Sequence, residues 1–329
     1  MDSLYGFSLD LIRWLQENYP QLEGFFKLIS GLGSIEFYLA ILPLIYWTIN
    51  KRLGKQLGFV LFISVGINTI FKQALRGPRP FWLDPTLGLL KTGGYGIPSG
   101  HTQYATALFL LIAGWYSRAW GWLLAIVMIF LMALSRIYLG DHFLSDIVAG
   151  FLLGLLLLSG YLIWRRYFAM RLSKRILGQR LLVGIIATVL MASLYLAILL
   201  VIGKPDLFVP WSEYIPEAEL SSKTEMAKAV GALLGFSIGI VLEGARVRFR
   251  SDGPLGKRAA RYILGIIVTI IIWRGLGILF PDDPLWLAIP LRNFRYFLVA
   301  LWASYYAPAI FVRLRLADAE PQPRINLRL

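Results

Sequence analysis

The chain has 329 residues, of which 57% are hydrophobic and 16% charged, with 33 basic against 19 acidic side chains. Soluble domains have about 25% charged and about 45–50% apolar residues, so this composition excludes a disordered protein and argues against a soluble globular one. The sequence contains no cysteine and two histidines, His101 and His142. Disulfides, thiolate metal sites and a three-histidine metal site are therefore excluded.

The first thirty residues predict an amphipathic helix and not a secretory signal. Charged residues interrupt any apolar signal core, and no small-residue cleavage site follows. Between residues 7 and 29 the apolar side chains recur at helical spacing. This pattern indicates a helix that lies at the membrane interface. A helix that docks on the rest of the protein gives the same pattern and is the interpretation we prefer.

The remainder of the chain predicts an all-α bundle with nine membrane-spanning helices. A span needs about 20 apolar residues, with a range of about 17–25. The segments that meet this requirement are residues 33–50, 56–75, 102–118, 120–139, 143–164, 181–202, 227–245, 262–280 and 289–312. The third and fourth of them are almost contiguous, so we expect a tight hairpin there.

Basic residues predict the orientation of the bundle, because Lys and Arg are enriched in short cytoplasmic loops. Basic blocks follow the first, fifth, seventh and ninth segments, at residues 51–55, 165–180, 246–261 and 313–328. Nine spans place all four blocks on one side, which would make the N-terminus external and the C-terminus cytoplasmic. The blocks then need no nucleic-acid partner. The absence of glycosylation sequons from outward loops favours a prokaryotic plasma membrane.

Two outward loops, residues 76–101 and 135–146, break this charge pattern, and three cations cluster where the first loop begins. Lys72 and Arg76 are four residues apart on one helix face, which Gly77-Pro78 ends. Arg79 follows on a turn between two prolines. The cluster suits a phosphate, because Arg offers a planar fork of donors and Lys a point charge. Lipid-anchoring basic residues at a helix end are the alternative.

A second stretch, Pro98-Ser99-Gly100-His101, opens the third segment. Ser99 is of the residue type preferred as an N-cap, and Gly100 lets the backbone approach a ligand closely. Free N–H groups at the helix start can bind an anion, and His101 can act as a general acid or base. When this stretch is considered alone, we prefer to interpret it as a capped helix start with an interfacial histidine.

The third stretch runs from Ser135 to Asp146. His142 and Asp146 lie four residues apart and share a helix face. A carboxylate on one imidazole nitrogen fixes the tautomer and leaves the other nitrogen nucleophilic. Arg136 would supply another phosphate contact. The alternative is a structural histidine–aspartate hydrogen bond.

Together, the three stretches fall at the outer ends of the second to fifth segments and include both histidines. They fill every fixed position of the pattern Lys-x6-Arg-Pro, Pro-Ser-Gly-His and Ser-Arg-x5-His-x3-Asp. The chain therefore resembles the type-2 phosphatidic acid phosphatase superfamily, which also includes bacterial acid phosphatases and vanadium haloperoxidases. The resemblance covers residues 30 to about 200 and implies three parts: the amphipathic helix 1–32, a phosphatase membrane core 33–202, and an accessory membrane region with a cytoplasmic tail, 203–329.

The resemblance implies a metal-independent reaction through a phosphohistidine, with no cofactor. His142 would attack phosphorus, Asp146 would orient His142, and His101 would protonate the leaving oxygen. The phosphoryl oxygens would be held by Lys72, Arg79, Ser99, Gly100 and Arg136. Further candidates for holding the substrate headgroup are Arg76, Arg274, Arg292 and Arg295. For the last three we prefer a bracing role, through pairing with Asp282, Asp283 or Glu225.

These expectations predict hydrolysis of a lipid phosphate or diphosphate ester at the non-cytoplasmic face. The partners would be the lipid substrate and the bilayer, with no nucleic acid. A lipid phosphotransferase that uses the same phosphoenzyme is a second possibility. A lipid transporter or flippase that binds headgroups without chemistry is a third, although it leaves the placement of both histidines unexplained.

Overall fold

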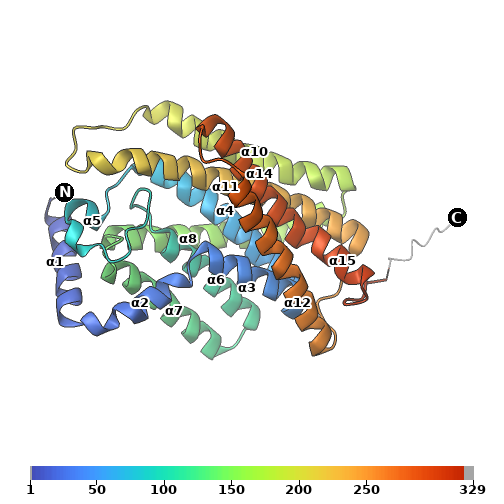
Figure 1. The fold of residues 1–329 in the computed structure, drawn as a ribbon. Helices are drawn as coiled ribbons and strands as arrows, with labels where there is room; N and C mark the ends of the chain where they lie inside the picture. Colours follow the sequence, from blue (N-terminus) through green and yellow to red (C-terminus); the bar gives the residue numbers. More distant parts are fainter. Residues whose placement is uncertain (1, 322–329) are drawn as a thin grey trace.

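The computed structural model describes residues 2–321 and folds them into a bundle of helices (Figure 1). The predicted all-α architecture is confirmed, and among the described residues only an isolated bridge, Phe249 to Ala319, is of β type. The tail residues Arg324 and Arg328 of the fourth basic block lie outside this range. The α-helices are α1 Asp2–Asn18, α2 Glu23–Gly31, α3 Ile35–Leu44, α4 Lys51–Leu75, α5 Pro80–Leu83, α6 Gly100–Tyr116, α7 Ala119–Tyr138, α8 Leu144–Trp164, α9 Met170–Ser173, α10 Leu177–Ile202, α11 Ile215–Leu242, α12 Leu255–Ile270, α13 Leu276–Leu279, α14 Leu285–Leu301 and α15 Ala307–Arg313.

The structure does not confirm the expected number of nine spans. Seven described helical segments are long and apolar enough to cross a membrane, or eight if a pair bent by 52° between residues 20–31 and 35–49 counts as one span. Helix α6, which corresponds to the third predicted segment, has 17 residues, the lower limit for a span. The helix is short because it begins directly after its N-cap, Ser99 of the second motif, and ends before its left-handed C-cap, Ser117.

The N-terminal segment forms two helices, because Pro20 interrupts the predicted single one. The side chain of Ile12 in α1 is fully buried against Leu87, Ile137 and Ile147. Farther along, Phe26 in α2 packs beside Tyr138. These contacts favour docking on the protein, which is the interpretation that we preferred from the sequence.

Helices α4, α6, α7 and α8 pack around one another to form the core. Two glycines of α8 allow this helix to approach α6 closely. A Cβ at Gly150 would strike the backbone oxygen of Ser99, just before α6, and a Cβ at Gly154 would strike that of Gln103 in α6. This approach brings the start of α8 to the start of α6. The two helices thereby position the second and third sequence motifs beside each other.

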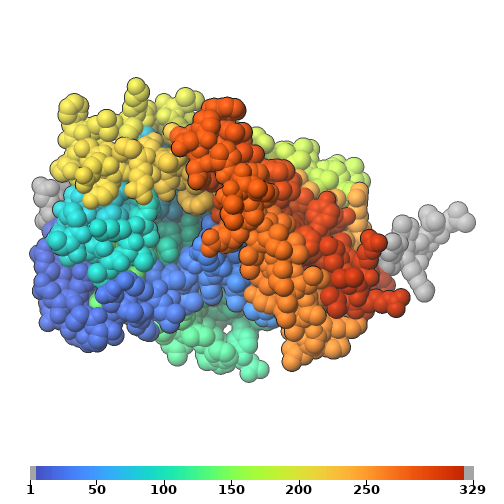
Figure 2. All heavy atoms as spheres, in the orientation of Figure 1, coloured from blue at the N-terminus to red at the C-terminus, as the bar shows by residue number. Residues whose placement is uncertain are grey.

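The accessory region adds α10 to α15, and its helix α11 packs along both α4 and α14 (Figure 1). Gly231 and Gly235 of α11 face the backbone of α14, where a Cβ would meet the carbonyl oxygens of Asn293 and Phe297. Small residues spaced by four allow such close packing of helices in membranes. In Figure 2 the blue and cyan segments of the core and the yellow to red segments of the accessory region share the visible face.

The basic blocks gather at one end of the bundle. Lys51 and Lys55 at the start of α4 pair with the buried Glu243 at 2.7 and 3.1 Å, and Lys51 also donates to the carbonyl of Phe249. Arg165 after α8 donates to Gln56 at 3.1 Å. The motif loop 84–99 follows the opposite end of α4. Basic loops and motifs are thus separated along the long axis of the bundle.

Candidate active site

The three motif stretches meet around one cavity of about 420 Å³. Lys72 and Arg79 reach it from the end of α4 and the turn after it, Gly100 and His101 from the start of α6, and His142 from the loop before α8. The imidazole of His101 packs against Gly33, where any side chain would collide with it. The sequence therefore identified five residues that the fold brings to a single cavity.

His142 and Asp146 form the expected pair. The His142 Nδ1 atom lies 3.2 Å from Asp146 Oδ2, and the same carboxylate oxygen accepts the backbone N–H of Phe143 at 3.0 Å. Because this oxygen serves as a hydrogen-bond acceptor, the contact places the proton on Nδ1 and the lone pair on Nε2. The side chain of His142 is buried. Its Nε2 atom is thus presented to the cavity as a potential nucleophile.

Burial also determines the charge of His142. Desolvation, followed by the nearby cations Arg79 and Lys72, holds the pKa of the His142 imidazole well below its ordinary value. A histidine with such a pKa is neutral at neutral pH. Neutral imidazole is the form that can attack an electrophile.

Arg79 and Lys72 are fixed by the backbone of the loop between α5 and α6. The Arg79 guanidinium donates to the carbonyls of Gly94 at 2.6 Å, Gly93 at 2.9 Å and Asp141 at 3.0 Å, and its Nη1 lies 3.5 Å from His142 Nε2. The Lys72 ammonium donates to the carbonyl of Tyr95. These bonds hold two cations next to the imidazole, where a phosphoryl group would need them.

Arg136 does not line the described cavity. Its guanidinium is fully buried and donates to Asp141 and to the hydroxyl of Ser30. Asp141 is buried as well, lies 3.8 Å from Arg79, and accepts the Thr92 hydroxyl at 2.9 Å. Asp141 thus joins Arg136 to Arg79, a role that its position next to His142 in the sequence did not reveal.

The second motif folds as the sequence predicts. Ser99 is the N-cap of α6, with its hydroxyl 3.5 Å from the N–H of Thr102 and 3.1 Å from the Thr102 hydroxyl. Gly100 is tightly enclosed, since a Cβ there would lie 3.1 Å from the Asn68 carboxamide oxygen and from the Tyr104 hydroxyl. Ser99 is buried and is not among the residues that line the cavity, so its contact with a phosphate stays a prediction.

The four additional arginines lie away from the cavity lining in the described part of the chain. Arg76 caps α4 in a left-handed conformation and pairs with Glu219 at 3.3 Å. Arg292 pairs with Asp282 at 2.7 Å and donates to the Thr224 hydroxyl at 3.0 Å. Arg274 lies 5.0 Å from the ring of Trp273, and Arg295 lies 5.3 Å from that of Tyr296. The Arg292 contact is one of the bracing pairs considered from the sequence.

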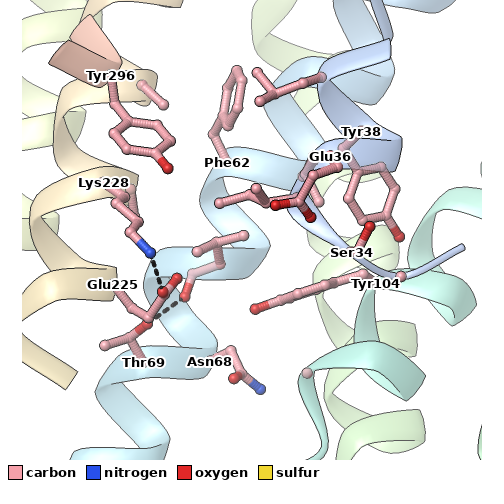
Figure 3. Close-up of a pocket in the computed structure, with 18 of the residues that line it drawn as sticks. Ser34, Glu36, Tyr38, Phe62, Asn68, Thr69, Tyr104, Glu225, Lys228 and Tyr296 are labelled. Atoms are coloured by element: carbon pink, nitrogen blue, oxygen red, sulfur yellow. Dashed lines mark hydrogen bonds and ion pairs between the residues drawn. The ribbon is translucent and has the colours of Figure 1, made fainter. Parts of the chain in front are cut away.

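Beyond the motif residues, the cavity has polar side chains that sequence reasoning missed. Thr69, Tyr104, Glu225 and Lys228 line it, and Figure 3 shows them facing one another from α4, α6 and α11. Glu225 and Lys228 form an ion pair at 2.6 Å. The sequence does show two charges, Glu225 and Lys228, near the start of a predicted apolar helix. It does not show which helices pack against them. The accessory region therefore contributes a wall of the site.

Comparison with known proteins places these observations in a family. Residues 53–170 match the model of the PAP2 superfamily, and residues 227–319 match that of the PAP2 superfamily phosphatase transmembrane extension. The accessory region has no counterpart in the family core. Residues 227–319 of this region instead match the family model of the transmembrane extension. No solved structure matches the chain.

Individual relatives agree with these matches. The chain is 30% identical to lipid phosphate phosphatase delta of Arabidopsis thaliana over 158 residues, which are 43% of this chain and 38% of that protein. It is 30% identical to undecaprenyl-diphosphatase of Sulfolobus acidocaldarius over 157 residues, 45% of this chain and 74% of that protein. With glucose-6-phosphatase catalytic subunit 1 of Mus musculus it shares 24% identity over 304 residues, 83% of this chain and 84% of that protein.

The matched region spans about two fifths of the plant relative's own length. The archaeal and mouse proteins are covered over most of theirs, and the mouse match continues from the core into the accessory region. Motifs, helical architecture, family models and relatives all agree, and the chain belongs to the PAP2 superfamily.

Proposed function

We propose that the chain is an integral-membrane phosphatase that hydrolyses a phosphate or diphosphate ester of a lipid through a phosphohistidine. One observation carries the proposal: a cavity with two histidines and two fixed cations at one end continues between membrane-spanning helices. The names of the plant and archaeal relatives, a lipid phosphate phosphatase and an undecaprenyl-diphosphatase, favour a lipid substrate.

The proposed reaction has two steps. His142 Nε2 forms a bond to phosphorus as the ester P–O bond breaks, and His101 gives a proton to the departing oxygen. Water then attacks the phosphohistidine with His101 as the base, the P–N bond breaks, and inorganic phosphate leaves. Lys72 and Arg79 would stabilise the charge on the equatorial oxygens, which is the main catalytic task in phosphoryl transfer.

We place the site at the non-cytoplasmic face of a prokaryotic plasma membrane. The support is the separation of the basic blocks from the motifs: Lys51, Lys55 and Arg165 lie at one end of the bundle, and His142 lies at the other. By the positive-inside rule the basic end is cytoplasmic. The outward loop after α10 then includes Asp206, and the inward segment between α8 and α10 includes Ser173 at the end of α9.

Phosphate release tests the function. Purified chain in nanodiscs is given phosphatidate, a polyprenyl diphosphate and a sphingoid-base phosphate, and the same panel is given to His142→Ala. We expect release by the parent chain and a loss of about 10²–10⁴-fold or more in the variant. Rapid quench with a labelled substrate should trap an acid-labile phosphoenzyme in the parent only. Transfer of the label to an added alcohol instead of water would identify a phosphotransferase.

Orientation is tested separately in this cysteine-free chain. Ser173→Cys and Asp206→Cys are each treated in intact cells with a membrane-impermeant maleimide. We expect labelling of the second variant alone, and labelling of the first variant alone would mean that the site faces the cytoplasm.

A further inference from the structure

The cavity extends well past the phosphate site, along a single face of α4. The α4 residues that line it are Gly54, Gly58, Leu61, Phe62, Val65, Asn68, Thr69 and Lys72. Gly54 and Lys72 are about 27 Å apart along the helix at 1.5 Å per residue. This length approaches the roughly 30 Å thickness of a bilayer's hydrocarbon core. The cavity is therefore long in the direction in which lipid chains lie.

Polarity changes along this length. Next to Lys72, one helical turn deeper, lies Thr69, and the Glu225–Lys228 pair of α11 faces it (Figure 3). Farther from Lys72 the lining is mostly apolar, although Glu36 of α3 and Thr269 of α12 also belong to it. Small residues line it on facing helices: Gly58 on α4, Ala232 on α11 and Ala300 on α14. We name the three residues Thr69, Glu225 and Lys228 the polar girdle.

Close packing fixes the walls of the deep part. A Cβ at Gly58 would strike the ring of Phe236, and Phe236 itself is held by edge-to-face contacts with Phe59 and Phe62 at 5.0 and 5.3 Å. Walls fixed in this way leave a narrow space. A volume of about 420 Å³ is at the low end of the roughly 300–1,000 Å³ typical of small-molecule sites.

The polar girdle has a charged pair inside helix α11, which is long and apolar enough to span a membrane. Ionisable residues inside membrane segments are costly to insert and commonly mark a ligand pathway. Within the described residues, Glu225 and Lys228 bond to each other and not to the motif residues. Their remaining donors and acceptors can therefore serve a group on the ligand.

We infer that this cavity binds the organic part of the substrate as one extended hydrocarbon chain, with a hydroxyl or amino group on its first carbons at the polar girdle. The inference rests on the proposed function and adds a substrate class to it: single-chain, polar-substituted lipid phosphates. The accessory helices α11 and α14 supply one wall of this binding site. A sugar phosphate, which would fill only the polar end, is the competing occupant.

Photocrosslinking tests chain placement without any turnover. An alkylphosphonate with a diazirine on its terminal carbon is bound to the full chain in nanodiscs and irradiated, and the labelled peptides are mapped. We expect labels on α4 between Gly54 and Phe62 and on α11 between Ala232 and Phe236, lost when hexadecyl phosphate competes. Labels confined to lipid-facing helices such as α10 would overturn the inference, whatever the catalytic result.

Kinetics test the substrate class. For hexyl, dodecyl and hexadecyl phosphates, kcat/KM should rise with chain length, and a 2-amino or 2-hydroxy group should raise it further. Ala232→Phe should shift the preference towards the short chain by about tenfold or more. Lys228→Met with Glu225→Gln should abolish the gain from the polar substituent. Val189→Phe on the lipid-facing side of α10 is the control and should change neither property.

The outcomes separate the two claims. Release of no phosphate from any probe refutes the proposed function, whereas turnover that is independent of chain length, or best with glucose 6-phosphate, refutes the inferred chain site. A second variant, Ala303→Phe in the helical turn after α14, guards against misfolding of Ala232→Phe. Each variant is used only if its melting temperature is within a few degrees of the parent value.

Discussion

The Tyr95 hydroxyl donates a hydrogen bond of 2.7 Å to Glu219, a residue of the accessory helix α11. Tyr95 also accepts the Lys72 ammonium on its backbone carbonyl. Glu219 binds two further groups at the end of α4, Gln73 at 2.9 Å and Arg76 at 3.3 Å. The accessory region therefore holds the loop that positions Lys72, a residue predicted to bind phosphate, in addition to lining the cavity.

Tyr95→Phe should lower kcat/KM about tenfold for every substrate. The substitution removes one hydrogen bond to a charged group, worth about 1.5–3 kcal/mol, and loosens the carbonyl that fixes Lys72. Steady-state kinetics with a short and a long substrate provide the measurement. Tyr214→Phe is a matched control, because Tyr214 stacks on Trp82 through its ring. Parent-like kinetics in Tyr95→Phe would show that Glu219 does not position the loop.

Gly33→Ala should lower kcat by about 10- to 100-fold, since displacement by about 1 Å at a reacting group can cost about 10²-fold. The added Cβ would overlap the His101 ring, which would have to move. Gly31→Ala, two residues earlier, meets no atom within 4 Å and should retain parent kinetics. If both variants behave alike, the contact between Gly33 and His101 does not position the imidazole.

His142 should stay neutral throughout the neutral pH range. Its pKa is lowered by burial and by the cations Arg79 and Lys72, so protonation requires a pH below the ordinary histidine value of about 6.5. The nucleophilic form is thus retained as the pH falls towards that value and is lost only below it. Because the chain has two histidines, ¹⁵N-histidine NMR of His101→Gln reports on His142 alone. A titration midpoint at or above 6.5 would contradict the burial argument.

Arg292→Gln should reduce stability slightly and leave KM unchanged. Its partner Asp282 is 88% exposed, and such ion pairs contribute about 0.2–1 kcal/mol. Arg274→Gln should also leave KM unchanged, because Arg274 lies over Trp273 and away from the cavity lining in the described residues. Thermal unfolding in detergent and the KM for a lipid phosphate are the two readouts. A raised KM in either variant would support the headgroup role instead.

The local chemistry of the motifs could be predicted from the sequence. Four-residue spacing on a helix fixes a shared face, so the His142–Asp146 pair followed directly from the numbering. The Ser99 cap and the end of α4 at Arg76 follow from local side-chain and backbone preferences in the same way. Apolar runs of span length likewise determined that the chain is a helical membrane protein.

Contacts between distant segments were decided only by the tertiary structure. Nothing near Arg136 in the sequence shows that Ser30 of α2 would accept its guanidinium and, together with Asp141, hold it away from the cavity lining. The number of spans also remained undetermined, because the 17-residue α6 is at the lower limit for a span and the 52° bend between residues 20–31 and 35–49 is invisible in hydropathy. In the sequence, the charged residues Glu219, Glu225 and Lys228 have no visible relation to the motifs. Their place at the site depends on the packing of α11 against α4, which only the tertiary structure shows.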